Sequence, residues 1–245
     1  MSARHLGRAV LAVGVVIAPV ASVAIARPAA AQEARASDAR APESRRPETA
    51  PAARTWELRA TIGRVEHRVD AGFGVGASSG TVLGVAARVR RWPAVELDAH
   101  AWGGQLDADD IARDDRTVGE IGARAGMRAT PWLALVASAT VRGVDAAPAV
   151  QRWTQFGAGA ELRLGFADGL LHSVVEMSLL PRVSVSGGAD PDIGLRSGVG
   201  LRLEHRRLQA TLAYSVERYA FPAESGADSR REQLSGLQLG VGARW

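Results

Sequence analysis

The sequence predicts an all-β fold: an antiparallel, up-and-down transmembrane β-barrel of about ten strands, with eight or twelve as open alternatives. Three observations lead to this prediction. From Thr55 onward, apolar residues alternate with Gly or charged residues. The connections between these stretches alternate between short and long, and aromatic residues gather near the stretch ends. Period-two alternation is typical of strands with two different faces, whereas an amphipathic helix would repeat its apolar positions every three to four residues.

The final stretch carries the clearest pattern. Leu237, Leu239, Val241, Ala243 and Trp245 share one face, and mostly Gly and polar residues share the other. The same alternation predicts strands within 117–130, 153–166, 192–205 and 207–221, and weaker versions predict strands at 55–69, 81–92, 94–103, 132–143 and 171–185. Strands of about 9–11 residues can cross a bilayer at a tilt.

The predicted connections differ in length on the two sides of the barrel. Short ones lie near 91–94, 130–132, 167–169 and 204–207, and long polar ones near 70–80, 104–116, 144–152, 186–192 and 222–232. Short turns on one side and long loops on the other, with an even number of strands, are typical of an outer-membrane barrel.

Aromatic residues are expected to form two girdles at the membrane interfaces. One girdle would contain Trp56, Trp92, Trp132, Phe166 and Trp245 at the short-turn side. The other would contain Trp102, Trp153, Tyr219 and Phe221 at the long-loop side, although Trp102 has the wrong parity to face outward on its strand.

The segment before the barrel predicts export. Residues 1–31 combine a basic start, an apolar run and a small-residue cleavage pattern, so we expect a signal peptide cut near Ala31, before Gln32. A retained transmembrane helix is the alternative. Residues 32–54, rich in Pro, Ala, Glu and Arg, are expected to be a disordered linker. The barrel would then occupy residues 55–245.

The composition excludes several classes of function. All 30 basic residues are Arg, which gives a net charge of +4, but the Arg residues do not cluster with one sign as nucleic-acid binding requires. The chain has no Cys, so disulfides, thiolate metal sites and Cys nucleophiles are excluded. No cofactor or nucleic-acid partner is predicted.

In its architecture, residues 55–245 resemble the small outer-membrane β-barrel proteins of Gram-negative bacteria, the OmpA-type barrels. Gln238, Gly240 and the terminal aromatic Trp245 are similar to the C-terminal signal that the barrel-assembly machinery reads in this family, whereas Ala243 departs from it. The resemblance implies a location in the outer membrane, both termini in the periplasm, and contact with the assembly machinery, membrane lipids and lipopolysaccharide. It does not imply one function.

If the apolar faces meet lipid, charged residues line the lumen. Five alternate strands each place one Arg near the short-turn side: Arg90, Arg128, Arg163, Arg202 and Arg244. The acids available to meet them are Glu57, Glu96, Asp98, Glu161 and Glu204. These charges predict either a salt-bridged plug or an Arg-lined constriction that favours anions.

Catalytic and metal sites are weakly indicated. Asp98 and His100, with Asp107 and Asp109 in the next loop, superficially resemble the carboxylate–His sites of outer-membrane proteases, but strands so short would not rise far above the membrane. His172 and Ser173 would lie on opposite faces of their strand, so they could not share a proton-transfer site. The loop 104–116 contains several acidic residues whose oxygen atoms suit Ca²⁺ or Mg²⁺, although their spacing is not that of an EF-hand. These residues are Asp107, Asp109, Asp110, Asp114 and Asp115.

The preferred functional hypothesis is therefore a non-enzymatic outer-membrane barrel that acts as a structural or surface protein or as a narrow pore. A barrel hydrolase with its site at the outer rim is one alternative. A secreted soluble barrel that binds an apolar ligand is the other, although its lumen should be apolar rather than charged.

Overall fold

The computed structural model describes residues 55–71, 74–92, 94–109, 115–146, 149–223 and 229–245. The expected signal peptide and linker lie outside the described residues. The elements are β1 Thr55–Asp70, β2 Val75–Trp92, β3 Val95–Ala108, β4 Arg116–Arg128, β5 Leu133–Ala146, β6 Ala149–Phe166, the 3₁₀ turn η1 Ala167–Gly169, β7 Leu171–Val185, β8 Ile193–His205, β9 Leu208–Ala220 and β10 Arg231–Arg244.

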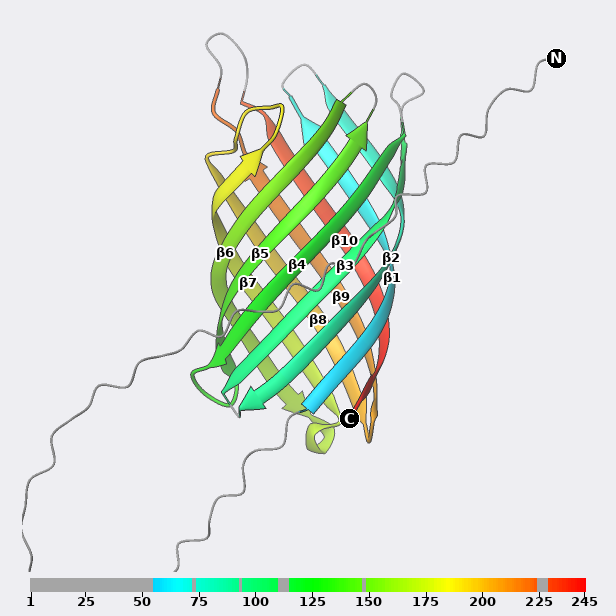
Figure 1. The fold of residues 1–245 in the computed structure, drawn as a ribbon, viewed down its shortest axis with the longest axis vertical. Helices are drawn as coiled ribbons and strands as arrows, with labels where there is room; N and C mark the ends of the chain where they lie inside the picture. Colours follow the sequence, from blue (N-terminus) through cyan, green and yellow to red (C-terminus); the bar gives the residue numbers. More distant parts are fainter. Residues whose placement is uncertain (1–54, 72–73, 93, 110–114, 147–148, 224–228) are drawn as a thin grey trace, which may run out of the picture. The chain divides into compact units, whose positions relative to one another are not determined.

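The ten described strands form one closed antiparallel barrel, in which each strand pairs with its neighbours in sequence and β1 pairs with β10 (Figure 1). The closing pair runs in register from Glu57 opposite Arg244 to Asp70 opposite Arg231. Closure therefore leaves no described strand at a free edge of the sheet. The predicted fold class and the preferred strand number are confirmed.

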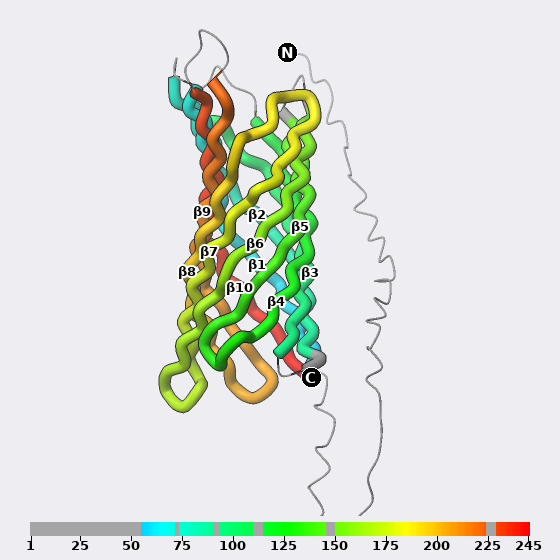
Figure 2. Tube along the Cα trace, turned by 90° about the vertical axis from the view of Figure 1, so that its left-hand side faces the viewer, coloured from blue at the N-terminus to red at the C-terminus, as the bar shows by residue number. Residues whose placement is uncertain are grey.

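The two ends of the barrel differ. The "turn end" holds the start of β1, the end of β10, and the connections β2–β3, β4–β5, β6–β7 and β8–β9 (Figure 2). The "loop end" holds the other five connections. At the turn end, β8 and β9 are joined by Arg206 and Arg207 alone, and Arg206 adopts a left-handed conformation with φ 53°.

The strands are longer than the expected 9–11 residues. They contain 13 to 18 residues and extend mainly toward the loop end. Thus 75–80 belongs to β2 although a loop was predicted there, and β5 and β6 leave only residues 147–148 between them. Segment 75–80 is rich in Gly, Ala and Ser, which weakens the alternation, while pairing with β1 makes it a strand. The argument from short strands against an outer-rim site is therefore wrong.

A β-bulge changes the parity of β7. Its pairing with β6 shifts between Leu179 and Arg182, where Pro181 lies. Proline lacks the N–H that a regular ladder needs, so a bulge accommodates it. After the bulge, Val183 and Val185 are buried instead of the even-numbered residues that face inward earlier in the strand.

Large apolar side chains cover the outside of the barrel, and they include Leu58, Ile62, Leu83, Ile121, Leu135, Val175, Val199 and Leu239. An apolar outer surface around a closed barrel is the pattern of a β-barrel that spans a membrane. At the turn end, Trp56, Trp132, Phe166 and Trp245 are exposed, as expected for one aromatic girdle. The side chain of Trp92 lies outside the described part. Among the described residues, no helix is long and apolar enough to cross a membrane.

The second predicted girdle is wrong. Trp153, Tyr219 and Phe221 are buried inside the barrel, and Trp102 packs partly buried against them. The physical reason is parity: on β6 and β9 these aromatic residues share the inward face with Gln155 and Glu217. The inside of the loop end therefore holds a cluster of apolar and aromatic side chains, with the largely buried His67–Glu232 pair beside it.

Candidate functional site: the barrel lumen

An apolar plug closes the lumen toward the loop end. Its buried members come from nine strands and the residue after β9: Val65, Val82, Leu106, Val118, Val144, Trp153, Leu180, Val183, Val185, Tyr219, Phe221 and Leu234. Side chains fill narrow barrels in this way, and an apolar constriction is a barrier to ions and water.

Aromatic rings form the centre of the plug. The Trp153 ring centroid lies 5.1 Å from that of Tyr219 and 6.0 Å from that of Phe221, in tilted and edge-on arrangements. β8 contributes Gly194 instead of a bulky residue, and a Cβ at Gly194 would lie 3.0 Å from both Leu180 and Tyr219. The missing side chain makes room for the packing of its neighbours.

Beneath the plug, Arg142 forms the centre of a buried ion-pair cluster. Its guanidinium donates to Glu120 and to Glu217 Oε2, the latter at 2.7 Å, and is 4% exposed. Arg196 also donates to Glu217, at 2.7 Å, and the Tyr219 hydroxyl donates to Glu217 at 2.5 Å. The two arginines and two glutamates balance in charge. Because they come from β4, β5, β8 and β9, their ion pairs connect these strands across the lumen.

At the turn end, a second layer of ion pairs crosses the lumen. Glu96 lies 3.1 Å from Arg88, 3.3 Å from Arg90, 3.4 Å from Arg163 and 3.7 Å from Arg128. These pairs come from strands that are not all neighbours, so the layer stiffens the barrel wall as well as neutralising charge.

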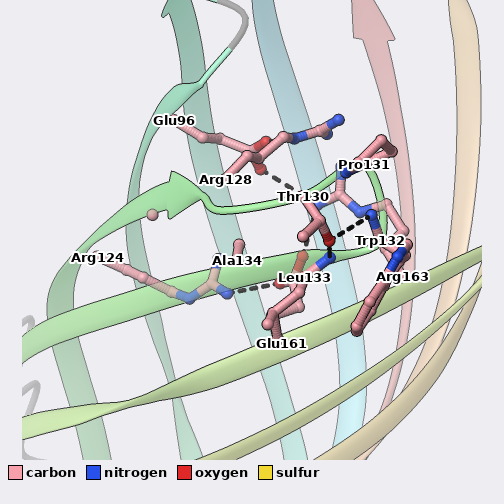
Figure 3. A pocket seen from close by; sticks show the side chains of 11 residues that line it. Glu96, Arg124, Arg128, Thr130, Pro131, Trp132, Leu133, Ala134, Glu161 and Arg163 are labelled. Atoms are coloured by element: carbon pink, nitrogen blue, oxygen red, sulfur yellow. Dashed lines mark hydrogen bonds and ion pairs between the residues drawn. The ribbon is translucent and has the colours of Figure 1, made fainter.

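Glu161 is the second acceptor of this layer. Arg124 donates to it at 2.5 Å and Arg163 at 2.7 Å, close to the Thr130–Leu133 turn (Figure 3). In that turn, the Thr130 hydroxyl accepts from the backbone N–H of Leu133 at 3.0 Å. Figure 3 shows the Arg124, Arg163 and Glu96 side chains gathered around the small pocket behind this turn.

The remaining predicted lumen residues lie in the same region. Arg88 reaches Asp98 at 3.1 Å, Arg244 donates to Glu204 at 2.9 Å, and Gln209 donates to Glu57. Arg202 approaches Glu204 only to 3.7 Å, which is longer than a hydrogen bond. All ten predicted lumen residues therefore have a charged or hydrogen-bonding partner within or beside the barrel.

The residues considered for catalysis do not meet. Asp98 pairs with Arg88, whereas His100 Nε2 lies 3.1 Å from Glu120 Oε1, beneath the plug. Asp107 is exposed near the loop end, above the plug. His172 and Ser173 are consecutive in β7, so they face opposite sides of the wall. The described part of the chain contains no group of three or more His, Asp or Glu side chains that could hold a metal; Asp110 and Asp114 lie outside it.

The three residues that resemble the C-terminal assembly signal occupy different positions in the barrel. Gln238 lines the lumen, Gly240 lies opposite Thr61 and Thr211, and Trp245 is exposed at the turn end. The backbone of Trp245 exchanges hydrogen bonds of 2.9 and 3.0 Å with Trp56, which completes the closure of the barrel.

Sequence reasoning missed the plug and the Arg142 cluster. Strand parity was the available signal: Glu120, Arg142 and Glu217 all lie on the charged faces of their strands. Glu120 and Arg142 lie opposite each other on the neighbouring strands β4 and β5. The contact between Arg142 and Glu217 could not be read, because it depends on how β5 and β9 face each other across the lumen.

Comparisons with known proteins identify the fold alone. No family model and no curated protein matches the chain. Among solved structures, the outer membrane protease OmpT from Escherichia coli matches with a TM-score of 0.50 at 9% identity, over 80% of this chain and 97% of that one. The translocator domain of the autotransporter NalP from Neisseria meningitidis matches over 78% of this chain and 88% of that one, at 13% identity and a TM-score of 0.42. The OmpT match therefore shows a shared barrel architecture.

Proposed function

We propose that this chain is a structural or surface protein of the Gram-negative outer membrane whose barrel does not conduct. The apolar plug carries the proposal, because it spans the lumen with buried side chains from almost every described strand. Below it, the Arg142 cluster and the turn-end layer pair opposite charges across the same lumen. An ion-selective pore requires an open constriction lined by charges of one sign, and neither the plug nor the ion-pair layers provide one.

The membrane location rests on the outer surface. The large apolar side chains on the outside of the barrel form an apolar belt. This belt is far larger than the contiguous apolar patch of a few hundred square ångströms that soluble proteins usually expose. The exposed aromatic residues at the turn end match the position of one lipid–water interface. The proposal includes lipid and lipopolysaccharide as contacts of this belt, and the barrel-assembly machinery as a partner of β10.

A charge placed on the belt tests the membrane location. Leu239 is exposed near the middle of β10, so Leu239→Arg should weaken folding into lipid vesicles by about 2–4 kcal/mol. Leu208→Arg is the matched control: it places the same charge at the turn end of β9, where the cost should be about 0–1 kcal/mol. Urea titration in vesicles, followed by the heat-modifiable gel band, measures both. Equal effects at the two positions would contradict a membrane-spanning belt.

A permeability assay tests the closed lumen. Liposomes that contain the refolded protein should swell in an isotonic sugar solution no faster than empty liposomes, because the plug leaves no continuous aqueous path. A gel of the same liposomes must show the folded, heat-modifiable band, which ensures that a negative result comes from inserted protein. Swelling that increases with the amount of folded protein would overturn the closed-lumen proposal.

A further inference from the structure

A cavity of about 260 Å³ lies in the lumen between the two ion-pair layers. Arg196 of the Arg142 cluster lines one side, and Arg88 and Arg124 of the turn-end layer line the other. Its wall on β8 and β9 consists of inward residues with little or no side chain: Gly198, Gly200, Ala213 and Ser215. The space is far larger than the roughly 10–15 Å³ that a single water needs.

The lining of this cavity carries more positive than negative charge. It contains five Arg (Arg59, Arg88, Arg124, Arg196 and Arg202) but only three carboxylates (Asp98, Glu161 and Glu176). The arginines differ in how closely a carboxylate approaches them. Arg88, Arg124 and Arg196 each have a carboxylate within 3.1 Å. Arg59 and Arg202 approach Glu57 and Glu204 only to 3.7 Å, so their charges are the least neutralised.

Five buried nitrogens of the same arginines have no hydrogen-bond acceptor among the described residues. The unsatisfied atoms are Nε of Arg59, Arg124 and Arg202 and Nη1 of Arg88 and Arg202. Arg202 is 5% exposed, and two of its guanidinium nitrogens are therefore desolvated without a hydrogen bond. An unsatisfied buried donor is costly, more so in a charged group, so the hydrogen-bonding capacity of these arginines is not met by the carboxylates around them.

Arg59 and Arg202 line the same cavity although β1 and β8 are not neighbours. The Arg59 side chain crosses β10 at Gly240, where an added Cβ would lie 2.9 Å from Arg59 Cδ and 2.5 Å from Thr211 Oγ1. Thr211 is in turn the register partner of Arg202. The missing side chain at Gly240 thus leaves the space that Arg59 Cδ and the Thr211 hydroxyl border, opposite Arg202 on β8.

We propose that the cavity is a binding site for a small free oxyanion of the size of phosphate or sulfate, held by Arg59, Arg202 and the Thr211 hydroxyl, with Arg88 beside them. Planar guanidinium groups bind such anions with paired, charge-assisted hydrogen bonds. The site is blind, since the plug closes its loop side; a small pocket that shares Arg124 and Glu161 with it leads toward the turn end. A lipid headgroup is excluded as the source, because the hydrogen-bonded wall of β7 to β10 is continuous.

Calorimetric titration of the refolded full chain in a nonionic detergent tests the site. The probes are inorganic phosphate and sulfate, each titrated at low ionic strength, and a short-chain phosphatidic acid in the micelle as the lipid arm. We expect saturable binding of both inorganic anions at one site per barrel, a higher midpoint of thermal unfolding in their presence, and no competition from the lipid.

Two variants locate the binding. Arg202→Gln should weaken phosphate binding about tenfold or more, because a charge-assisted hydrogen bond is lost. Arg90→Gln removes a lumen charge outside the cavity and should bind as the parent does. Since Arg202→Gln could also impair folding, Ala213→Asp provides a second variant: its carboxylate would occupy the cavity, abolish phosphate binding and preserve or raise the thermal midpoint. Its isosteric neutral partner Ala213→Asn should retain binding.

Three results would overturn the proposal. The first is the absence of saturable phosphate and sulfate binding by the folded parent. The second is binding that Arg202→Gln and Ala213→Asp leave unchanged. The third is displacement of phosphate by the phosphatidic acid, which would assign the binding to the outer surface.

Discussion

Replacing Arg142 by Met should destabilise the barrel by about 3–5 kcal/mol, because the substitution removes the cation paired with the buried Glu120 carboxylate. Glu120 pairs with Arg142, whereas Glu217 would retain Arg196 at 2.7 Å. Met matches the length of the aliphatic part of Arg, so the loss would come mainly from charge rather than from packing. Urea unfolding in lipid vesicles measures the change in the free energy of unfolding.

Two further substitutions make this result specific. Adding Glu120→Gln to Arg142→Met should recover part of the loss, since the stranded carboxylate becomes a neutral amide. Arg68→Met serves as the matched control: Arg68 pairs with Glu66 at 3.1 Å on the surface, where an ion pair is worth about 0–1 kcal/mol. A loss of similar size for Arg142→Met and Arg68→Met would show that the buried cluster does not hold the barrel together.

Replacing Trp153 by Ala should cost about 3–5 kcal/mol, the usual range for truncating a buried aromatic side chain. Trp153 is 3% exposed and contacts the Tyr219 and Phe221 rings, so its removal opens a cavity in the centre of the plug. Leu162→Ala is a suitable control, because Leu162 lies on the same strand but is 40% exposed on the outer surface. If the two variants lose the same stability in vesicles, Trp153 does not belong to a packed plug.

The strands and their number follow from the sequence because the rule behind them is local. Alternate residues of a strand face opposite sides. In the last predicted strand, the odd-numbered residues from Leu237 to Trp245 therefore identify the lipid face, and the even-numbered residues from Gln238 to Arg244 identify the lumen face, without knowledge of any neighbouring strand. Strand ends were harder to place. Residues 75–80 lack strong alternation, and only their pairing with β1 makes them part of β2.

The lumen could be predicted only in part. The parity of Arg90, Arg163 and Glu96 was enough to place them inside, near one end. The aromatic residues Trp153 and Tyr219 follow the parity of their strands and face the lumen, although aromatic residues near strand ends are typical of membrane interfaces. The contact between Arg142 and Glu217, and the path of Arg59 over Gly240, depend on the curvature and stagger of the closed barrel. No local pattern encodes them.

The closed lumen is tested most directly by single-channel recording in a planar bilayer, with the parent protein beside the double variant Trp153→Ala/Phe221→Ala. Both proteins must first show the folded, heat-modifiable band. The plug predicts no conductance steps from the parent and discrete steps from the double variant, in which two aromatic side chains no longer fill the lumen. Steady conductance of the folded parent, or the absence of conductance steps from the folded double variant, would contradict the plug as the seal.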